Sequence, residues 1–67
     1  MSKNYEDFET IGEFTGFCPE CGFAVGFLET EMNEEIDLQC TKFFCDVCNI
    51  KIVVVDDFNE ILETYEA

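Results

Sequence analysis

The chain of 67 residues contains no histidine, no tryptophan and no arginine, and it has a single proline. The absence of histidine excludes Ser-His and Cys-His catalytic pairs and zinc sites that mix cysteine with histidine. Three lysines cannot form the basic patch that a nucleic-acid-binding protein uses to neutralise phosphates, or bind an anionic membrane surface. No apolar run approaches the length of a membrane span, and the N-terminal residues lack an apolar signal core. We therefore expect a cytoplasmic protein without direct nucleic-acid or membrane contacts.

Acidic residues dominate the charge, because 16 Asp and Glu against 3 Lys give a formal net charge of −13. Hydrophobic residues nevertheless make up 48% of the chain, and eight of them are phenylalanine, which is more than a disordered acidic tail contains. We expect a single folded domain over residues 1–67. A core of this size is marginal and usually needs disulfides or a metal ion in addition.

Four of the five cysteines form two pairs, Cys18-Pro19-Glu20-Cys21 and Cys45-Asp46-Val47-Cys48. The C-x2-C-x23-C-x2-C spacing is typical of tetrahedral zinc bound through four thiolates. Each pair is followed by a residue that tolerates the left-handed backbone of such a turn, Gly22 or Asn49. In a reducing cytosol, cysteine pairs act as metal ligands more often than as disulfides. The sequence therefore predicts one zinc ion per chain, held by Cys18, Cys21, Cys45 and Cys48, with two disulfides or free thiols as the alternative.

The fifth cysteine, Cys40, follows Ile36 and Leu38 in an alternating apolar pattern that predicts a half-buried strand. Its simplest role is that of a small hydrophobic residue in the core. The alternative is that Cys40 is the fourth metal ligand in place of Cys45 or Cys48.

Two further segments favour strands, residues 23–28 and residues 50–55, and the latter is β-branched at every position except Lys51. Residues 31–35 are predicted to be a polar connection. In the lead-in over residues 1–16, a short helix carrying Tyr5, Phe8 and Ile11 on one face fits about as well as a strand through Glu13 and Phe14.

The last segment, residues 56–67, has the pattern of an acidic amphipathic helix. Asp57 and Glu60 have the spacing of a capping box. Apolar residues then recur at i, i+3, i+4 and i+7, as expected for one helical stripe; they are Phe58, Ile61, Leu62 and Tyr65. We expect this helix to dock on the sheet of its own chain or in the groove of a partner.

Residues 17–55, with Phe17-Cys-Pro-Glu-Cys-Gly-Phe and Phe44-Cys-Asp-Val-Cys-Asn-Ile each followed by a strand, resemble the two knuckles of a zinc ribbon. The resemblance implies a three-stranded antiparallel sheet pinned at one end by zinc, with the four paired cysteines as ligands. Together with the C-terminal helix, the expected fold class is a small metal-stapled α+β domain. Zinc ribbons occur in transcription factors, polymerase subunits, ribosomal proteins and small viral regulators.

The strong negative charge predicts a basic protein partner, although solubility or adaptation to high salt would also explain it. The leading hypothesis is a non-enzymatic interaction module that modulates or inhibits a nucleic-acid-binding protein such as RNA polymerase, as a phage or viral regulator. Catalysis is not expected, because four thiolates leave the metal no open position. A rubredoxin-like iron electron carrier is the alternative, although rubredoxins place Cys-Pro-x-Cys-Gly in the second pair. The candidate partner-binding residues are Glu29, Glu31, Glu34, Glu35, Asp56, Asp57, Phe58 and Glu60.

Overall fold

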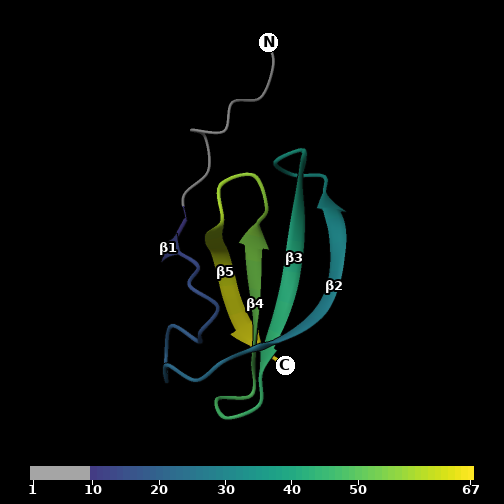
Figure 1. Ribbon diagram of the computed structural model, residues 1–67. Helices are drawn as coiled ribbons and strands as arrows, with labels where there is room; N and C mark the ends of the chain where they lie inside the picture. The colour runs from purple at the N-terminus through teal and green to yellow at the C-terminus, as the bar shows by residue number, and fades with distance from the viewer. Residues whose placement is uncertain (1–9) are drawn as a thin grey trace.

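Five antiparallel strands form a single sheet with the order β1-β5-β4-β3-β2 (Figure 1). The computed structural model describes residues 10–67. The strands are β1 (Gly12–Glu13), β2 (Gly26–Asn33), β3 (Leu38–Cys45), β4 (Ile50–Val55) and β5 (Glu60–Glu66). Short turns join β2 to β3, β3 to β4 and β4 to β5, so these four strands form a meander (Figure 1).

The β-branched run of β4 lies at the centre of the sheet, and its residues from Ile52 to Val55 are all buried. Because successive side chains of a strand point to opposite faces, β4 contributes to two apolar clusters. Ile52 and Val54 join the cluster that also contains Phe14, Cys18, Cys45 and Ile61. Val53 and Val55 join the second cluster, with Ile36, Leu38 and Cys40. The strand predicted over residues 50–55 is confirmed.

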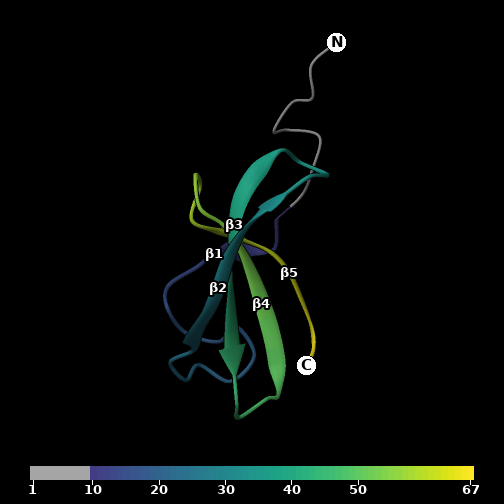
Figure 2. The same cartoon turned by 90° about the vertical axis from the view of Figure 1, so that its right-hand side faces the viewer.

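The segment before β2 packs on one face of the sheet. Phe14 stacks on Phe43 of β3 with ring centroids 4.5 Å apart, and Phe17 forms an isolated antiparallel bridge with Ala24. Figures 1 and 2 show this segment descending beside the sheet and then crossing its lower end to reach β2 on the far edge. The first two strands of the chain, β1 and β2, therefore form the two opposite edges of the sheet.

The C-terminal helix predicted over residues 56–67 is wrong, and residues 10–67 contain no helix at all. Residues 56–59 form a turn, and β5 then pairs with β4 along its length. Because successive side chains of a strand point to opposite faces, Ile61 packs in the first cluster while the adjacent Leu62 packs against the second. Two neighbouring apolar residues serving opposite faces produce the i, i+3, i+4 pattern without a helix.

The sheet is also larger than the predicted three-stranded ribbon. β1 and β5 are additional strands, and the predicted strands over residues 23–28 and 36–40 correspond to β2 and β3 with later starts and later ends. The polar connection expected over residues 31–35 is shorter, since β2 continues to Asn33. In the lead-in, β1 supports the strand alternative near Glu13, whereas Tyr5 and Phe8 of the helix alternative lie outside the described residues.

Four five-residue turns share one backbone geometry, at residues 18–22, 33–37, 45–49 and 55–59. In three of them the last residue donates its N–H to the carbonyl of the first, at 2.7–2.8 Å. The last residue of each turn has a positive φ, which Gly, Asn and Asp adopt most readily: Gly22 (82°), Asp37 (59°), Asn49 (59°) and Asn59 (56°). The left-handed positions predicted at Gly22 and Asn49 are confirmed.

Candidate metal centre

The turns at residues 18–22 and 45–49 meet at one end of the sheet and bring four cysteines together. Their Sγ atoms all lie within 4.8 Å of one another. Cys21 Sγ is 3.5 Å from Cys45 Sγ, and Cys18 Sγ is 3.9 Å from Cys48 Sγ. Four sulfurs at about 2.3 Å from a tetrahedral ion are about 3.8 Å apart, so the cluster has the dimensions of a four-thiolate metal site.

Backbone N–H groups of the two turns point at the first sulfur of each pair. Glu20 N–H donates to Cys18 Sγ at 3.3 Å, and Cys48 N–H donates to Cys45 Sγ at 3.4 Å. Burial acts to raise the pKa of the Cys18 thiol, but hydrogen bonds from the backbone of Cys21 and Glu20 and from the neighbouring cysteines outweigh it and lower this pKa to about 7. The cage therefore favours the thiolate form at Cys18.

The opposite shift occurs at Cys48, whose side chain shares a hydrogen bond with that of Cys21. This hydrogen bond, burial and the proximity of Cys18 raise the pKa of the Cys48 thiol to about 12. Sulfurs packed this closely cannot all be ionised without a cation between them. A divalent ion would replace the protons, so the affinity of the site for metal must fall as the pH falls.

Burial differs within each pair. The first cysteine of each turn is buried, with Cys18 at 3% and Cys45 at 1% exposure, whereas Cys21 and Cys48 are partly accessible. A metal ion here would be held by four protein ligands, which satisfies tetrahedral coordination without a position for substrate. The donor set suits zinc and also accommodates iron.

Cys40 is not part of the metal cluster. It is 1% exposed within the second apolar cluster, and its Sγ lies 3.9 Å from the Leu38 carbonyl. Burial raises the pKa of the Cys40 thiol, and the charges of Asp56, Glu31 and Glu63 raise it further. The prediction that Cys40 packs in the core is confirmed, and its alternative role as a fourth ligand is wrong.

The structure separates the eight candidate partner-binding residues into two groups. Glu29 and Glu31 lie on β2, where their carboxylates are 3.7 and 2.9 Å from Lys42 Nζ. The other six lie at the end of the sheet opposite the cysteines: Glu34 and Glu35 in the β2–β3 turn, and Asp56, Asp57, Phe58 and Glu60 in and after the β4–β5 turn. Within this group, the Asp56 carboxylate accepts a hydrogen bond from Thr41 and the Glu60 carboxylate accepts one from Thr10.

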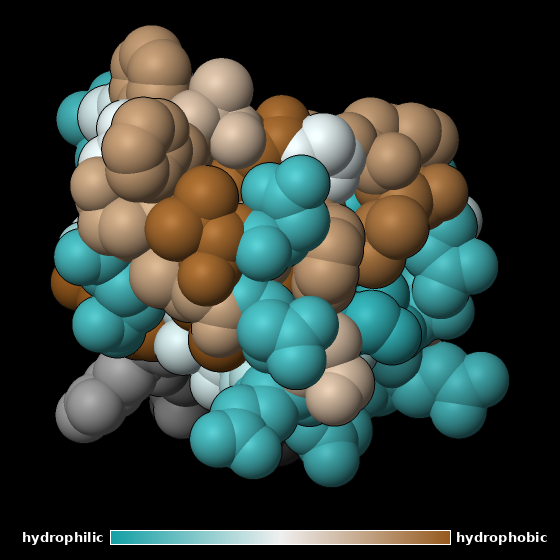
Figure 3. All heavy atoms as spheres, turned by 90° about the horizontal axis from the view of Figure 1, so that it is seen from below, coloured by the Kyte–Doolittle hydropathy of each residue, from teal (hydrophilic) through white to brown (hydrophobic). Residues whose placement is uncertain are grey.

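Large apolar side chains are exposed around the cysteines, which the sequence analysis did not single out as a surface. Phe17, Phe23 and Val47 are each exposed by more than half, at 51%, 60% and 59%. Figure 3, which views the molecule from this end, shows apolar side chains gathered over one part of the surface and hydrophilic ones over another. The sequence gives no signal for this surface, because Phe44 and Ile50 flank the second cysteine pair as Phe17 and Phe23 flank the first, and yet Phe44 and Ile50 are half-buried.

Comparison with known proteins yields no match among family models, curated sequences or solved structures. Within residues 10–67, no helix is long and apolar enough to cross a membrane.

Proposed function

We propose that the protein is a non-enzymatic interaction module of the zinc-ribbon type, in which one zinc ion holds the cysteine end together and the acidic surface binds a basic partner protein. The observation that carries the proposal is the closed cage of four sulfurs within 4.8 Å of one another. A zinc ion surrounded by four thiolates has no free position for a substrate and no redox chemistry, so its role would be structural. The surface of the sheet, and not the metal ion, would then bind the partner.

The charge of that surface supports a basic partner. The formal net charge is −13, and a four-thiolate zinc site would add about −2. Of the two lysines within the described range, Lys42 lies between Glu29 and Glu31. A negative field of this strength attracts basic proteins and accelerates their association. The most concrete form is a phage or viral regulator whose carboxylates occupy phosphate positions in a nucleic-acid-binding groove, for example that of RNA polymerase.

A rubredoxin-like iron electron carrier is the second candidate. It is favoured by the N–H···S hydrogen bonds from Glu20 and Cys48, because such bonds tune the reduction potential of iron–thiolate centres. An acidic surface would then orient a redox partner. An iron-loaded protein would be coloured, whereas a zinc-loaded protein would not.

Native mass spectrometry with elemental analysis tests the metal, and we expect one zinc ion per chain. Binding is then measured between the zinc-loaded protein and purified RNA polymerase at low and at high salt, with duplex DNA as competitor. We expect saturable binding that weakens with salt and that duplex DNA displaces. The variant Glu34→Gln/Asp57→Asn, with two fewer charges at the acidic turns, should bind more weakly.

Two results would overturn the proposal. One iron ion per chain would favour the electron carrier. Zinc-loaded protein that binds neither RNA polymerase nor other basic nucleic-acid-binding proteins at low salt would remove the interaction role.

A further inference from the structure

The two edges of the sheet differ greatly in length. β1 on one edge has two residues, whereas β2 on the other has eight, of which seven are exposed. Within residues 10–67, no strand pairs with the outer side of β2. An edge strand of this length presents a row of backbone donors and acceptors to any chain that approaches it.

The register of the sheet identifies the residues that face outward. The Gln39 carbonyl accepts a hydrogen bond from Asp56 N–H at 3.0 Å, so the backbone polar groups of Gln39 face away from β2. Met32 lies opposite Gln39, and this pair is therefore one of the non-hydrogen-bonded pairs of the β2–β3 ladder. Because these pairs alternate, the N–H and C=O groups of Met32 and Thr30 point to the open side of the edge.

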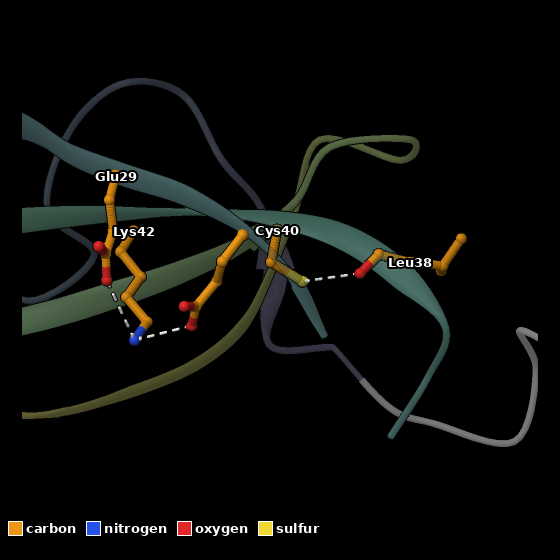
Figure 4. Close-up of polar contacts among 5 residues, drawn as sticks. Glu29, Leu38, Cys40 and Lys42 are labelled. Atoms are coloured by element: carbon orange, nitrogen blue, oxygen red, sulfur yellow. Dashed lines mark hydrogen bonds and ion pairs between the residues drawn. The ribbon is translucent and has the colours of Figure 1, made fainter. Parts of the chain in front are cut away.

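The side chains of β2 divide into an acidic row and an apolar row. Figure 4 shows Glu29 directed at Lys42. The Glu31 carboxylate is 2.9 Å from the same Lys42 Nζ, and Glu31 lies two residues after Glu29, so both carboxylates are on one face of the sheet. On the other face, Phe27 contacts the Phe43 ring edge-on at 6.3 Å. Met32 shares this second face, and Phe27 and Met32 are 64% and 56% exposed. Thr30 lies between them on this face, with its hydroxyl hydrogen-bonded to Thr41. A strand added to this edge would thus meet carboxylates on one face and, on the other, the exposed Phe27 and Met32 with Thr30 between them.

We propose that β2 binds an extended segment of the partner in which basic residues alternate with apolar ones, adding a sixth strand to the sheet. Backbone hydrogen bonds to Thr30 and Met32 would hold the segment, and its basic side chains would lie beside Glu29 and Glu31. The proposal rests on the proposed function, because it names the part of the basic partner that is bound.

A second copy of this chain does not suit the same edge. Antiparallel pairing of two β2 strands would place the carboxylates of Glu29 and Glu31 against those of the other copy, and both chains carry the same net charge of −13. The register shift between Phe27 and Glu29 also makes the strand irregular and less suited to self-pairing. The acidic row therefore opposes self-association while it attracts a basic strand.

The test uses the full, metal-loaded chain and two synthetic peptides of equal charge. One peptide alternates Lys and Val, and the other has the same composition except for a central proline, which prevents strand pairing. We expect the alternating peptide to bind at least fivefold more tightly than the proline peptide. On binding, the amide hydrogens of Thr30 and Met32 should become protected from exchange.

Matched variants of the edge separate backbone pairing from attraction by charge. Thr30→Pro removes an outward N–H without breaking a backbone hydrogen bond to β3, whereas Thr30→Val keeps this N–H. Both variants lose the side-chain hydrogen bond between Thr30 Oγ1 and Thr41 Oγ1 of β3, so their difference reports on the N–H. We expect Thr30→Pro to weaken binding of the alternating peptide about fivefold relative to Thr30→Val, the loss expected for one backbone hydrogen bond. Glu29→Gln/Glu31→Gln should weaken binding more than Glu34→Gln/Asp57→Asn, which removes the same charge elsewhere.

The outcomes distinguish this proposal from the one on which it rests. Equal binding of both peptides, with Thr30 and Met32 unprotected, would overturn strand addition and leave the attraction of basic partners intact. Failure of both peptides to bind at low salt would overturn both. Concentration-dependent dimers in sedimentation experiments that Thr30→Pro abolishes would assign the edge to a second copy and overturn the proposal.

Discussion

The two ends of the sheet are built from the same turn but are held together differently. Residues 18–22 and 45–49 at one end, and residues 33–37 and 55–59 at the other, all finish on a residue with positive φ. At the cysteine end, sulfur atoms accept the N–H groups inside the turns. At the acidic end, Asn33 Oδ1 accepts the corresponding N–H groups of Glu35 and Ile36.

The comparison indicates what a metal ion adds to this fold. The acidic end forms the same turn geometry without cysteines, so the metal is not required to shape a turn. It instead joins the turn at residues 18–22, in the segment before β2, to the β3–β4 hairpin. That segment has few other attachments to the sheet: β1, the Phe14–Phe43 stack and the hydrogen bonds around them. We expect the metal to supply this tertiary connection.

Removal of the metal should have the largest effect. A core of this size supplies about 3–5 kcal/mol, whereas a structural zinc site contributes about 10–16 kcal/mol. We expect chelation to unfold the wild-type domain, as measured by circular dichroism and amide NMR spectra, and added zinc to restore the spectra. Cys45→Ser, which lacks a ligand, should be unfolded in the same measurements. A chain shown to be metal-free that keeps its folded spectra would contradict the comparison between the two ends.

Substitutions of Asn59 test whether the left-handed backbone at the acidic end requires asparagine or glycine. Its φ is 56°, and its Nδ2 donates to the Phe14 carbonyl at 3.0 Å. Asn59→Ala removes the hydrogen bond and places a residue that tolerates this φ poorly, so it should lower the free energy of unfolding by about 2–3 kcal/mol. Asn59→Gly tolerates the φ and loses only the hydrogen bond, so it should lower the free energy of unfolding by about 1 kcal/mol. Urea unfolding of the metal-loaded variants measures both. Equal costs would mean that the backbone conformation is not the reason for asparagine here.

Cys40 provides the contrast between a core thiol and a ligand thiol. Cys40→Ala should lower the free energy of unfolding by about 1–2 kcal/mol, because it removes a buried sulfur from the second cluster. The metal content, measured by elemental analysis, should remain that of the wild type. Cys45→Ala is the matched change at the other end and should abolish metal binding. Loss of metal from Cys40→Ala would contradict the assignment of ligands.

Substitution of Asn33 should change the stability least among the four predicted experiments. Its Oδ1 accepts N–H groups from Glu35 at 2.9 Å and Ile36 at 3.4 Å, in an exposed turn. Asn33→Ala should cost about 0.5–1 kcal/mol in urea unfolding, and Asn33→Ser, which keeps an acceptor, should cost less. Identical costs for the two variants would show that the side-chain oxygen does not stabilise the turn.

The two cysteine turns could be predicted because each depends on local chemistry, and their clustering could be predicted because one tetrahedral metal ion needs four ligands. The spacing of each pair and the left-handed residue that follows it specify a turn that presents two sulfurs. The central strand was equally clear, since five of the six residues of β4 are β-branched. The burial of Cys40 followed from its alternation with Leu38. The exposed apolar surface near the cysteines was not predicted, because exposure depends on which other segments cover a side chain.

The C-terminal segment shows where sequence patterns become ambiguous. Asp56-Asp57-Phe58-Asn59 has the same form as Asp46-Val47-Cys48-Asn49, with Asp first and Asn last, and this repeat was the available sign of a hairpin turn. The capping-box spacing of Asp57 and Glu60 favoured a helix in the same place. The apparent helical stripe arose because Ile61 and Leu62 are adjacent in a strand that is buried on both faces, so each packs in a different cluster.

The sequence by itself determined the cysteine turns at residues 18–22 and 45–49 and the central strand, because each depends on residues close together in the chain. The need of a tetrahedral ion for four ligands predicted that the two turns meet, and the packing of the segment before β2 brings them together. Tertiary structure alone decided that residues 60–66 form a strand. A short segment is marginal as a helix in water, and the free side of β4 offers it backbone hydrogen bonds and two apolar clusters. Tertiary structure likewise left β2 as the long open edge, since the number of strands on each side of β4 is a property of the whole sheet.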